Sequence, residues 1–167
     1  FLPLREDGIL LPMANIAEIV SYTEPASLGT DTQVPDWVAG SVGWRGRALP
    51  VCVLERLIGQ PYEPPGVRGR IVVLHGLIEH ERLPFFGVVI QELPSMIVAS
   101  SASVHWIPAK FGVSEPQPGS APADRADESL SVDHGYVAGW VEASGRDGWI
   151  PALDRIEAEV TKVLPDG

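Results

Sequence analysis

The sequence predicts a mostly β protein built from two small lobes, and three observations support this prediction. The 17 Gly and 16 Pro residues are spread along a chain of 167 residues and divide it into short apolar segments, a pattern typical of small barrels and sandwiches. These segments have the length of single strands, and none approaches the ~20 apolar residues that span a bilayer. A weak internal repeat is also present, because the spacing of Gly40 and Gly46 returns at Gly139 and Gly145, each time followed by a proline and a helical pattern. Two related lobes would produce this repeat.

The expected strands are short, and several are rich in β-branched or aromatic residues. In chain order they cover residues 2–4, 9–11, 16–21, 38–44, 48–53, 71–77, 85–91, 95–100, 137–143 and 149–150. Three of the connections carry a turn signal, namely Asp7-Gly8, Arg45-Gly46-Arg47 and the stretch 145–148. The sequence therefore predicts three hairpins, the first at the start of the chain, the second across Arg45 and the third near the end.

Two helices are expected beside the strands. Residues 53–58 end at Gly59 with a proline beyond it, which is a helix stop signal. Residues 151–164 begin with a proline suited to the first helical turn and carry an apolar stripe. The stripe consists of Leu153, Ile156, Val160 and Val163. We expect this C-terminal amphipathic helix to pack its stripe on the body of the protein.

Residues 1–167 are expected to form a single domain, with approximate lobes at 13–60 and 66–150. The break between the lobes falls in the turn-rich stretch 60–69. Residues 115–129 are poor in large apolar side chains and cannot bury enough surface to become ordered, so they are predicted to be a flexible insertion.

Charge and cysteine content limit the classes of partner and compartment. The formal net charge is −10, and such a field repels phosphate groups, so nucleic acid and anionic membrane surfaces are poor candidates as partners. The single cysteine, Cys52, excludes an intrachain disulfide and lies in an apolar run, which favours a buried, inert thiol. No signal peptide or membrane-spanning segment is visible, so a cytoplasmic location is favoured.

A search for catalytic or metal-binding patterns finds none that is specific. The four histidines form no helical His-x-x-x-His pair, and no second cysteine could complete a zinc site. No Gly-x-Ser-x-Gly motif occurs, and the glycines at 40, 43 and 46 match neither the dinucleotide nor the phosphate-loop pattern. We therefore expect no enzymatic activity, no cofactor and no metal.

Residues 35–59 carry the most informative pattern, a strand, a tight Arg-Gly turn, a returning strand and a helical turn stopped by glycine. Gly46 suits a backbone with positive φ, and Pro50 is expected at a strand end or edge. Arg45 at the tip would point its guanidinium outward. From the residues alone, a solvated charge and an anchor for a partner, with Trp44 beside it, are equally good interpretations.

The run Trp37-Val38-x-Gly40-x4-Arg45-Gly46-x3-Pro50, followed by Leu54 and Gly59, resembles the signature of the CheW-like domain family. Residues 11–12 and 18–20 resemble the opening of that family. Residues 70–74, 87–89 and 139–154 resemble its second half. The Trp-Arg-Gly variant is most similar to the adaptors of pilus chemosensory systems, which control twitching motility by type IV pili.

The resemblance implies an all-β fold of two SH3-like five-stranded β-barrel lobes that share a hydrophobic seam. It also implies a non-catalytic adaptor, or scaffold, that couples chemoreceptors to a CheA-type histidine kinase in a chemotaxis or type IV pilus pathway. One barrel would pair with the regulatory domain of the kinase, and the groove between the barrels would take the cytoplasmic tip of the receptor. By position, the partner-binding residues would be Arg45, Trp44, Gly46, Glu18, Ile19 and Val20.

The sequence departs from the family pattern in three places, one of which is the acidic, proline-rich insertion 115–129. Gly43-Trp44 stands where the family usually has Asn-Leu, which suggests that this hairpin suits a different partner surface. Val53 stands where an Asp commonly caps the following helix, and since such a cap contributes about 1 kcal/mol, the helix 53–58 is expected to be weak.

One alternative function remains open, a small β-barrel that binds a low-molecular-weight ligand. The tryptophans could line its pocket, although packing in cores and hairpins is their ordinary role. They are Trp37, Trp44, Trp106, Trp140 and Trp149.

Overall fold

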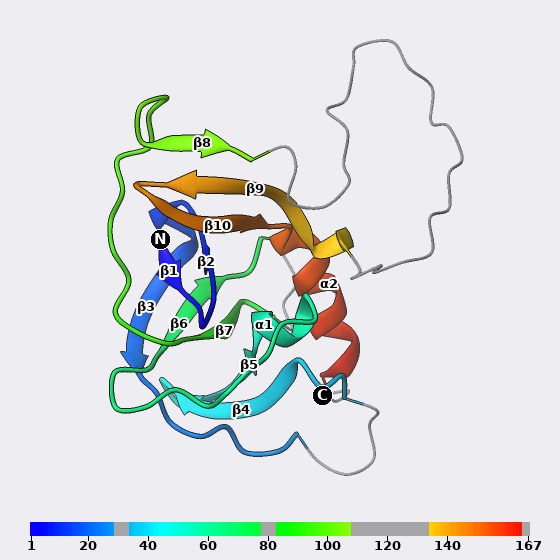
Figure 1. The fold of residues 1–167 in the computed structure, drawn as a ribbon. Helices are drawn as coiled ribbons and strands as arrows, with labels where there is room; N and C mark the ends of the chain where they lie inside the picture. Colours follow the sequence, from blue (N-terminus) through cyan, green and yellow to red (C-terminus); the bar gives the residue numbers. More distant parts are fainter. Residues whose placement is uncertain (29–33, 78–82, 108–133, 165–167) are drawn as a thin grey trace, which may run out of the picture.

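The computed structural model describes residues 1–28, 34–77, 83–107 and 134–164 (Figure 1). In these residues the strands form two five-stranded sheets, accompanied by short helices. The strands are β1 Leu2–Pro3, β2 Gly8–Ile9, β3 Ile16–Ser21, β4 Val38–Trp44, β5 Arg47–Cys52, β6 Arg70–His75, β7 Phe85–Ile90, β8 Val104–Trp106, β9 Val137–Ala143 and β10 Arg146–Pro151. The helices are the 3-10 turns η1 Met13–Asn15 and η2 His134–Tyr136 and the α-helices α1 Leu54–Leu57 and α2 Leu153–Val163. The predicted fold class, all-β with two lobes, short helices and a C-terminal helix, is confirmed.

The first lobe is the sheet with strand order β3-β6-β7-β5-β4. The chain that leaves β3 returns to β4, where Ala26 and Ser41 exchange two backbone hydrogen bonds of 2.8 Å. This bridge joins the two ends of the sheet, so the lobe closes into a small barrel.

The second lobe is the sheet with strand order β1-β2-β10-β9-β8. It therefore combines the first residues of the chain with its last strands, and a parallel bridge between Ile9 and Trp149 joins the two parts. The predicted lobe limits of 13–60 and 66–150 were wrong, because β6 and β7 belong to the first lobe and β1 and β2 to the second. The error arose because strand pairing is non-local, whereas the limits were drawn at breaks in the chain.

The internal repeat predicted from the glycines is present as a repeated hairpin. Positive φ angles occur at Arg45 (45°) and Gly46 (75°) in one turn and at Ser144 (53°) and Gly145 (77°) in the other. Two consecutive residues with positive φ form the tight turn that matches the twist of paired strands. Each hairpin then continues through a proline into a helix, α1 or α2.

The central strands β6 and β7 of the first lobe are buried on both faces. Inside the barrel, a cluster of buried apolar side chains forms one core: Trp44, Leu49, Val51, Val53, Ile71, Val73 and Val89. The alternate residues of β6 and β7, such as Val72 and Val88, face the other way and join Trp140 and Trp149 in a core between the lobes. Because side chains alternate along a strand, β6 and β7 supply both cores. This second core is the shared hydrophobic seam that the resemblance implied.

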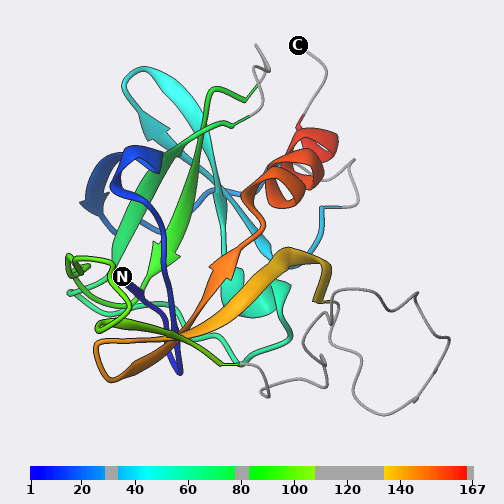
Figure 2. The same ribbon diagram turned by 90° about the horizontal axis from the view of Figure 1, so that it is seen from above.

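Helix α2 covers the seam, as Figure 2 shows from above. Its predicted stripe is buried, with exposures of 6% for Leu153, 0% for Ile156, 0% for Val160 and 6% for Val163. The expected docking of the helix is confirmed. Glu157 on the same helix is also fully buried, and one carboxylate oxygen accepts a hydrogen bond of 2.7 Å from the backbone N–H of Leu77. This contact ties the helix to the chain that follows β6.

Several local predictions require correction or comment. Residues 95–100 were predicted to be a strand but form none, and the strand beside β9 is β8 instead. Pro50 was expected at a strand end or edge, and this was wrong, because it lies inside β5 and β5 is flanked by β7 and β4. The described ladder between β5 and β7 begins one residue later, at Val51, so no N–H is required from Pro50 on that side. Helix α1 has no side-chain cap at Val53 and extends over a single turn.

The predicted insertion 115–129 lies outside the described residues. None of the helices in the described part of the chain is both long and apolar enough to cross a membrane.

Candidate functional site

The hairpin between β4 and β5 presents Arg45 at its tip. The Arg45 side chain is 69% exposed, so the predicted outward orientation is correct. A Cβ atom added to Gly43 or Gly46 would meet no atom within 4 Å, which means that the backbone around the tip is open to contact. The tip therefore combines one long cationic side chain with a backbone that a partner can approach closely.

Three of the predicted contact residues form one cluster at this tip. The carboxylate oxygen Oε2 of Glu18 on β3 accepts hydrogen bonds from the indole Nε1 of Trp44 at 2.9 Å and from Nε of Arg45 at 3.1 Å. Nη2 of Arg45 lies 3.0 Å from the same oxygen. The guanidinium carbon of Arg45 also lies 4.9 Å from the centre of the Trp44 ring, within the range of a cation–π contact.

The first-lobe core fixes the position of Trp44. Its ring is 8% exposed and makes an edge contact with Phe85 on β7 at 4.9 Å between ring centres. The ring of His75 on β6 also contacts Phe85, at 5.2 Å between ring centres. The exposed guanidinium of Arg45 is thus connected through aromatic rings to the packed end of the barrel.

The two other predicted residues on β3 face in different directions. Ile19 is 40% exposed and lines a groove, whereas Val20 is half-buried against the core of the first lobe. The structure therefore brings Arg45, Trp44, Gly46 and Glu18 together, puts Ile19 at a second surface and gives Val20 a packing role.

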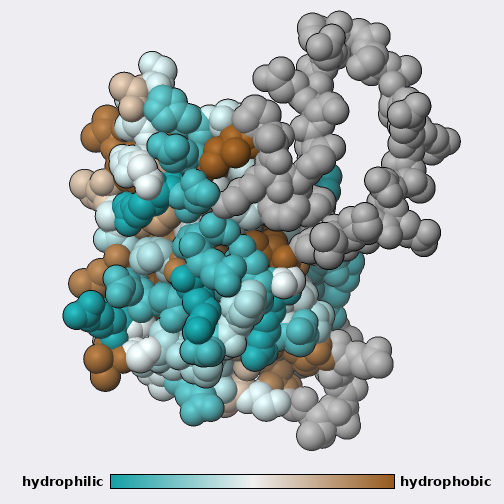
Figure 3. All heavy atoms as spheres, viewed as in Figure 1, coloured by the Kyte–Doolittle hydropathy of each residue, from teal (hydrophilic) through white to brown (hydrophobic). Residues whose placement is uncertain are grey.

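The sequence did not reveal a groove that the structure contains. It has a volume of about 780 Å³ and runs between β3 of the first lobe and residues 94–99, which lie beside the second lobe. Its lining is almost entirely apolar: Phe1, Leu2, Leu10, Leu11, Pro12, Met13, Ile16, Ile19, Pro94, Ser95, Met96, Ile97, Val98, Ala99 and Ile150. In Figure 3 hydrophobic side chains gather along the left edge of the molecule, where β3 and the chain between β7 and β8 lie in Figure 1.

Exposed apolar side chains border this groove. Met13 is 67% exposed, Met96 80% and Val98 87%. A sequence signal for this surface did exist, because residues 95–100 are a mostly apolar run. In the part of the chain that the structure describes, this run has no strand partner. Residues 95–100 were interpreted as a strand because their short apolar run has strand length. Clustered exposed apolar residues of this kind mark binding surfaces.

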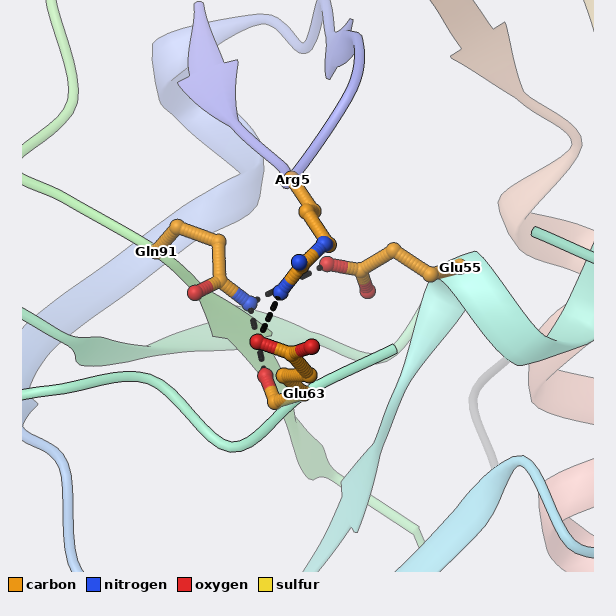
Figure 4. A network of polar contacts seen from close by, with 4 residues as sticks. All are labelled: Arg5, Glu55, Glu63 and Gln91. Atoms are coloured by element: carbon orange, nitrogen blue, oxygen red, sulfur yellow. Dashed lines mark hydrogen bonds and ion pairs between the residues drawn. The ribbon is translucent and has the colours of Figure 1, made fainter. Parts of the chain in front are cut away.

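A polar network fastens the two lobes together near the groove (Figure 4). Arg5, in the turn between β1 and β2, pairs with Glu63 of the stretch that follows α1. Nε2 of Gln91 donates to the backbone oxygen of Glu63 at 3.2 Å and lies 3.5 Å from Oε1 of Glu55. Glu55 on α1 is fully buried, and this burial raises the pKa of its carboxyl group above the ordinary value.

Neither catalytic chemistry nor metal binding is suggested by these residues. Within the described ranges, no three His, Cys, Asp or Glu side chains lie close enough together to hold a metal ion. Cys52 is buried, and burial raises the pKa of its thiol, which disfavours the reactive thiolate. No tryptophan lines the groove, so the tryptophans that could line a pocket under the alternative function do not form one there.

Comparisons with known proteins found a family model and a solved structure that match this chain. The family model of the CheW-like domain matches residues 2–131. A solved structure, that of the scaffolding protein TtCheW from Thermoanaerobacter tengcongensis, superposes with a TM-score of 0.61 at 16% sequence identity and covers 90% of this chain and 84% of that chain. Such low identity supports the fold alone. Among curated proteins, no sequence matches the chain significantly.

Proposed function

This chain belongs to the CheW-like domain family, and we propose that it is a non-catalytic cytoplasmic adaptor that couples chemoreceptors to a CheA-type histidine kinase. The observation that carries the proposal is the combination of an exposed cationic tip and an apolar groove on one folded chain. The Arg45 tip lies at the end of the first lobe, and the apolar groove runs between the lobes. An adaptor needs two surfaces because it has to hold two partners at once.

The Arg45 tip is proposed as the contact for the regulatory domain of the kinase. Its guanidinium is exposed, and the glycines around it leave the backbone accessible. Arginine is enriched at the energetic centres of interfaces, because its planar group presents several donors in a fixed geometry. We expect most of the binding energy at this surface to depend on Arg45.

The groove is proposed as the contact for the cytoplasmic tip of a receptor. Apolar grooves commonly take one face of an amphipathic helix, with the apolar residues of that face inserted into the groove. The side chains of Met13, Ile19 and Met96 are available for such a contact. Burial of a receptor helix would remove their exposed apolar surface from water.

The pathway is proposed to be a chemosensory system of type IV pili, which controls twitching motility. The support is the Trp44-Arg45-Gly46 turn, which is similar to the turn of adaptors from such systems. A deletion of the coding gene would test this: we expect a loss of directed twitching, whereas a loss of swimming chemotaxis alone would contradict the pilus assignment.

Co-purification with the CheA-type kinase and the receptor of the same organism tests the coupling function. Arg45→Asp should abolish binding of the kinase but retain the receptor, and Ile19→Asp should do the reverse. The matched controls are Arg68→Asp, whose side chain is 80% exposed and also lies near a glutamate, and Val67→Asp, which is 99% exposed. Both controls should bind both partners. Failure of the unchanged protein to bind either partner would refute the adaptor function.

A second candidate function is the binding of a small apolar ligand in the groove. It is favoured by one observation, the volume of about 780 Å³, which lies in the range of small-molecule sites, about 300–1,000 Å³. The probe 1-anilinonaphthalene-8-sulfonate would report on the groove by fluorescence. Displacement of the probe by a receptor tip peptide supports the adaptor, and displacement only by metabolites supports the second candidate.

A further inference from the structure

We propose that Trp44 is a positioning residue that holds the Arg45 guanidinium, through Glu18, in the orientation in which it receives a carboxylate of the kinase. The inference rests on the proposed function of the hairpin tip and adds to it the chemistry of the partner and the mechanism of presentation. Trp44 itself is 8% exposed and is therefore not available as a large contact surface.

Three donors converge on a single oxygen atom. Trp44 Nε1 donates at 2.9 Å and Arg45 Nε at 3.1 Å to Glu18 Oε2, and Arg45 Nη2 lies 3.0 Å from it. The indole therefore fixes Glu18 from the buried side, and Glu18 fixes Arg45 from the exposed side. The ring of Trp44 supports the same guanidinium by the contact at 4.9 Å.

This geometry determines which edge of the guanidinium faces the partner. Both contacts to Glu18 come from the edge that carries Nε and Nη2. The edge formed by Nη1 and Nη2 is directed away from Glu18, because the guanidinium is planar and its donors are fixed in a fork. That edge matches the two oxygens of a carboxylate in a bidentate pair.

Local charge also favours an acidic partner. Among the described residues, the turn carries Arg45 and Arg47, both exposed, and Glu18 is the carboxylate that pairs with Arg45. The tip is therefore locally positive on a chain with a formal net charge of −10. A carboxylate on the kinase would be attracted to the exposed guanidinium at this tip.

Holding the side chain in place has a measurable consequence. Ordering one long side chain at an interface costs about 2- to 12-fold in affinity. A protein in which Trp44 and Glu18 have already ordered Arg45 avoids this cost when it binds. Loss of the indole N–H should therefore weaken kinase binding within that range, although the residue that touches the partner is unchanged.

Binding of the purified CheA-type kinase by full-length variants tests the proposal. Trp44→Phe keeps an aromatic ring against Phe85 but removes the indole donor, and Trp106→Phe, at a tryptophan 58% exposed in the other lobe, is the matched control. Each change is also made together with Arg45→Ala. Urea unfolding of every variant is recorded in parallel. Dissociation constants are measured at low and high salt.

We expect Trp44→Phe to weaken kinase binding about 2- to 12-fold and to have no further effect when Arg45 is already alanine. The control variant Trp106→Phe should bind the kinase as tightly as the unchanged protein. Equal effects of Trp44→Phe with and without Arg45 would overturn the proposal, because they would show a role in stability alone. If Trp44→Phe does not fold, Glu18→Gln, at a half-exposed side chain, replaces it in the same comparison with and without Arg45→Ala.

Salt dependence tests the acidic partner. Binding of the unchanged protein should weaken at high salt, and Arg45→Ala should lose most of that dependence. Salt-independent binding would overturn the carboxylate assignment. If the unchanged protein does not bind the kinase at all, the proposed function fails before the role of Trp44 is reached, so the two failures are distinguishable.

Discussion

Replacement of Gly40 by alanine should be among the most damaging single-methyl changes in this protein. Gly40 lies in β4 with a φ of +135°, a region that side chains rarely adopt. A Cβ atom at this position would lie 2.2 Å from the backbone oxygen of Ala26 and 2.8 Å from its carbonyl carbon. The nearest atoms belong to the backbone, so no side-chain rotation can relieve the overlap.

The cost can be worked out from the contacts that would be lost. Ala26 and Ser41 exchange the two hydrogen bonds of 2.8 Å that close the first barrel, and the carbonyl oxygen that would have to move belongs to this pair. The two bonds together contribute about 2 kcal/mol, and the strained backbone adds about 1–3 kcal/mol. We therefore expect Gly40→Ala to lower the free energy of unfolding by about 3–5 kcal/mol, a large part of the about 5–15 kcal/mol typical of a domain.

Urea unfolding followed by circular dichroism would measure the change, with two matched glycines as controls. Gly46 has a φ of +75° but open space around its Cβ position, so Gly46→Ala isolates the backbone strain. Gly43 has open space and no positive φ, so Gly43→Ala should change stability by less than about 1 kcal/mol. If Gly40→Ala is no less stable than Gly46→Ala, the steric argument and the role of the Ala26 bridge are refuted.

Three further changes test other parts of the structure. Gly139→Ala should be tolerated better than Gly40→Ala, because the three atoms nearest to its Cβ all belong to the exposed ring of Trp106, which can rotate away; a loss as large as that of Gly40→Ala, measured by urea unfolding, would contradict this. Glu55→Gln should raise the melting temperature at pH 7, since burial raises the pKa of Glu55 and the folded state disfavours its charge; the contribution of Glu55 to stability should fall as pH rises above about 4.3, the unfolded value, so the gain from Glu55→Gln should disappear below that pH, and a gain that persists there would contradict the assignment. Ile156→Ala should cost about 2–5 kcal/mol because Ile156 is fully buried, whereas Arg155→Ala at the exposed face of α2 should change the free energy of unfolding little; equal losses would show that the helix does not dock through its stripe.

Local structure could be predicted from the sequence because it depends on neighbours in the chain. The turn at Arg45 and Gly46 needs positive φ, and the strands on both sides have the composition of paired strands, so the hairpin was predicted almost to the residue. The stripe of α2 is a property of spacing along one helix, and it is buried as expected. Arg45 was predicted to point outward for the same reason, since a hairpin tip has no neighbour to cover it.

The tertiary structure decided what depends on contacts between distant residues. No local signal could assign β6 and β7 to the first lobe, or join Ile9 to Trp149, because such pairings are chosen by the burial of both faces of a sheet. The groove likewise exists only where residues near 13–19 and 94–99 meet.

The same distinction applies to the candidate site. The sequence alone determined that Arg45 is presented on a tight turn of a two-lobed β protein, because a turn and its composition are local. Only the folded chain decided that Glu18, 27 residues away, and Trp44 hold it in place, that Val20 faces the core and that Ile19 faces the groove. The hydrogen bonds and the burial of these side chains are set when the strands pair, and no short stretch of the chain determines that pairing.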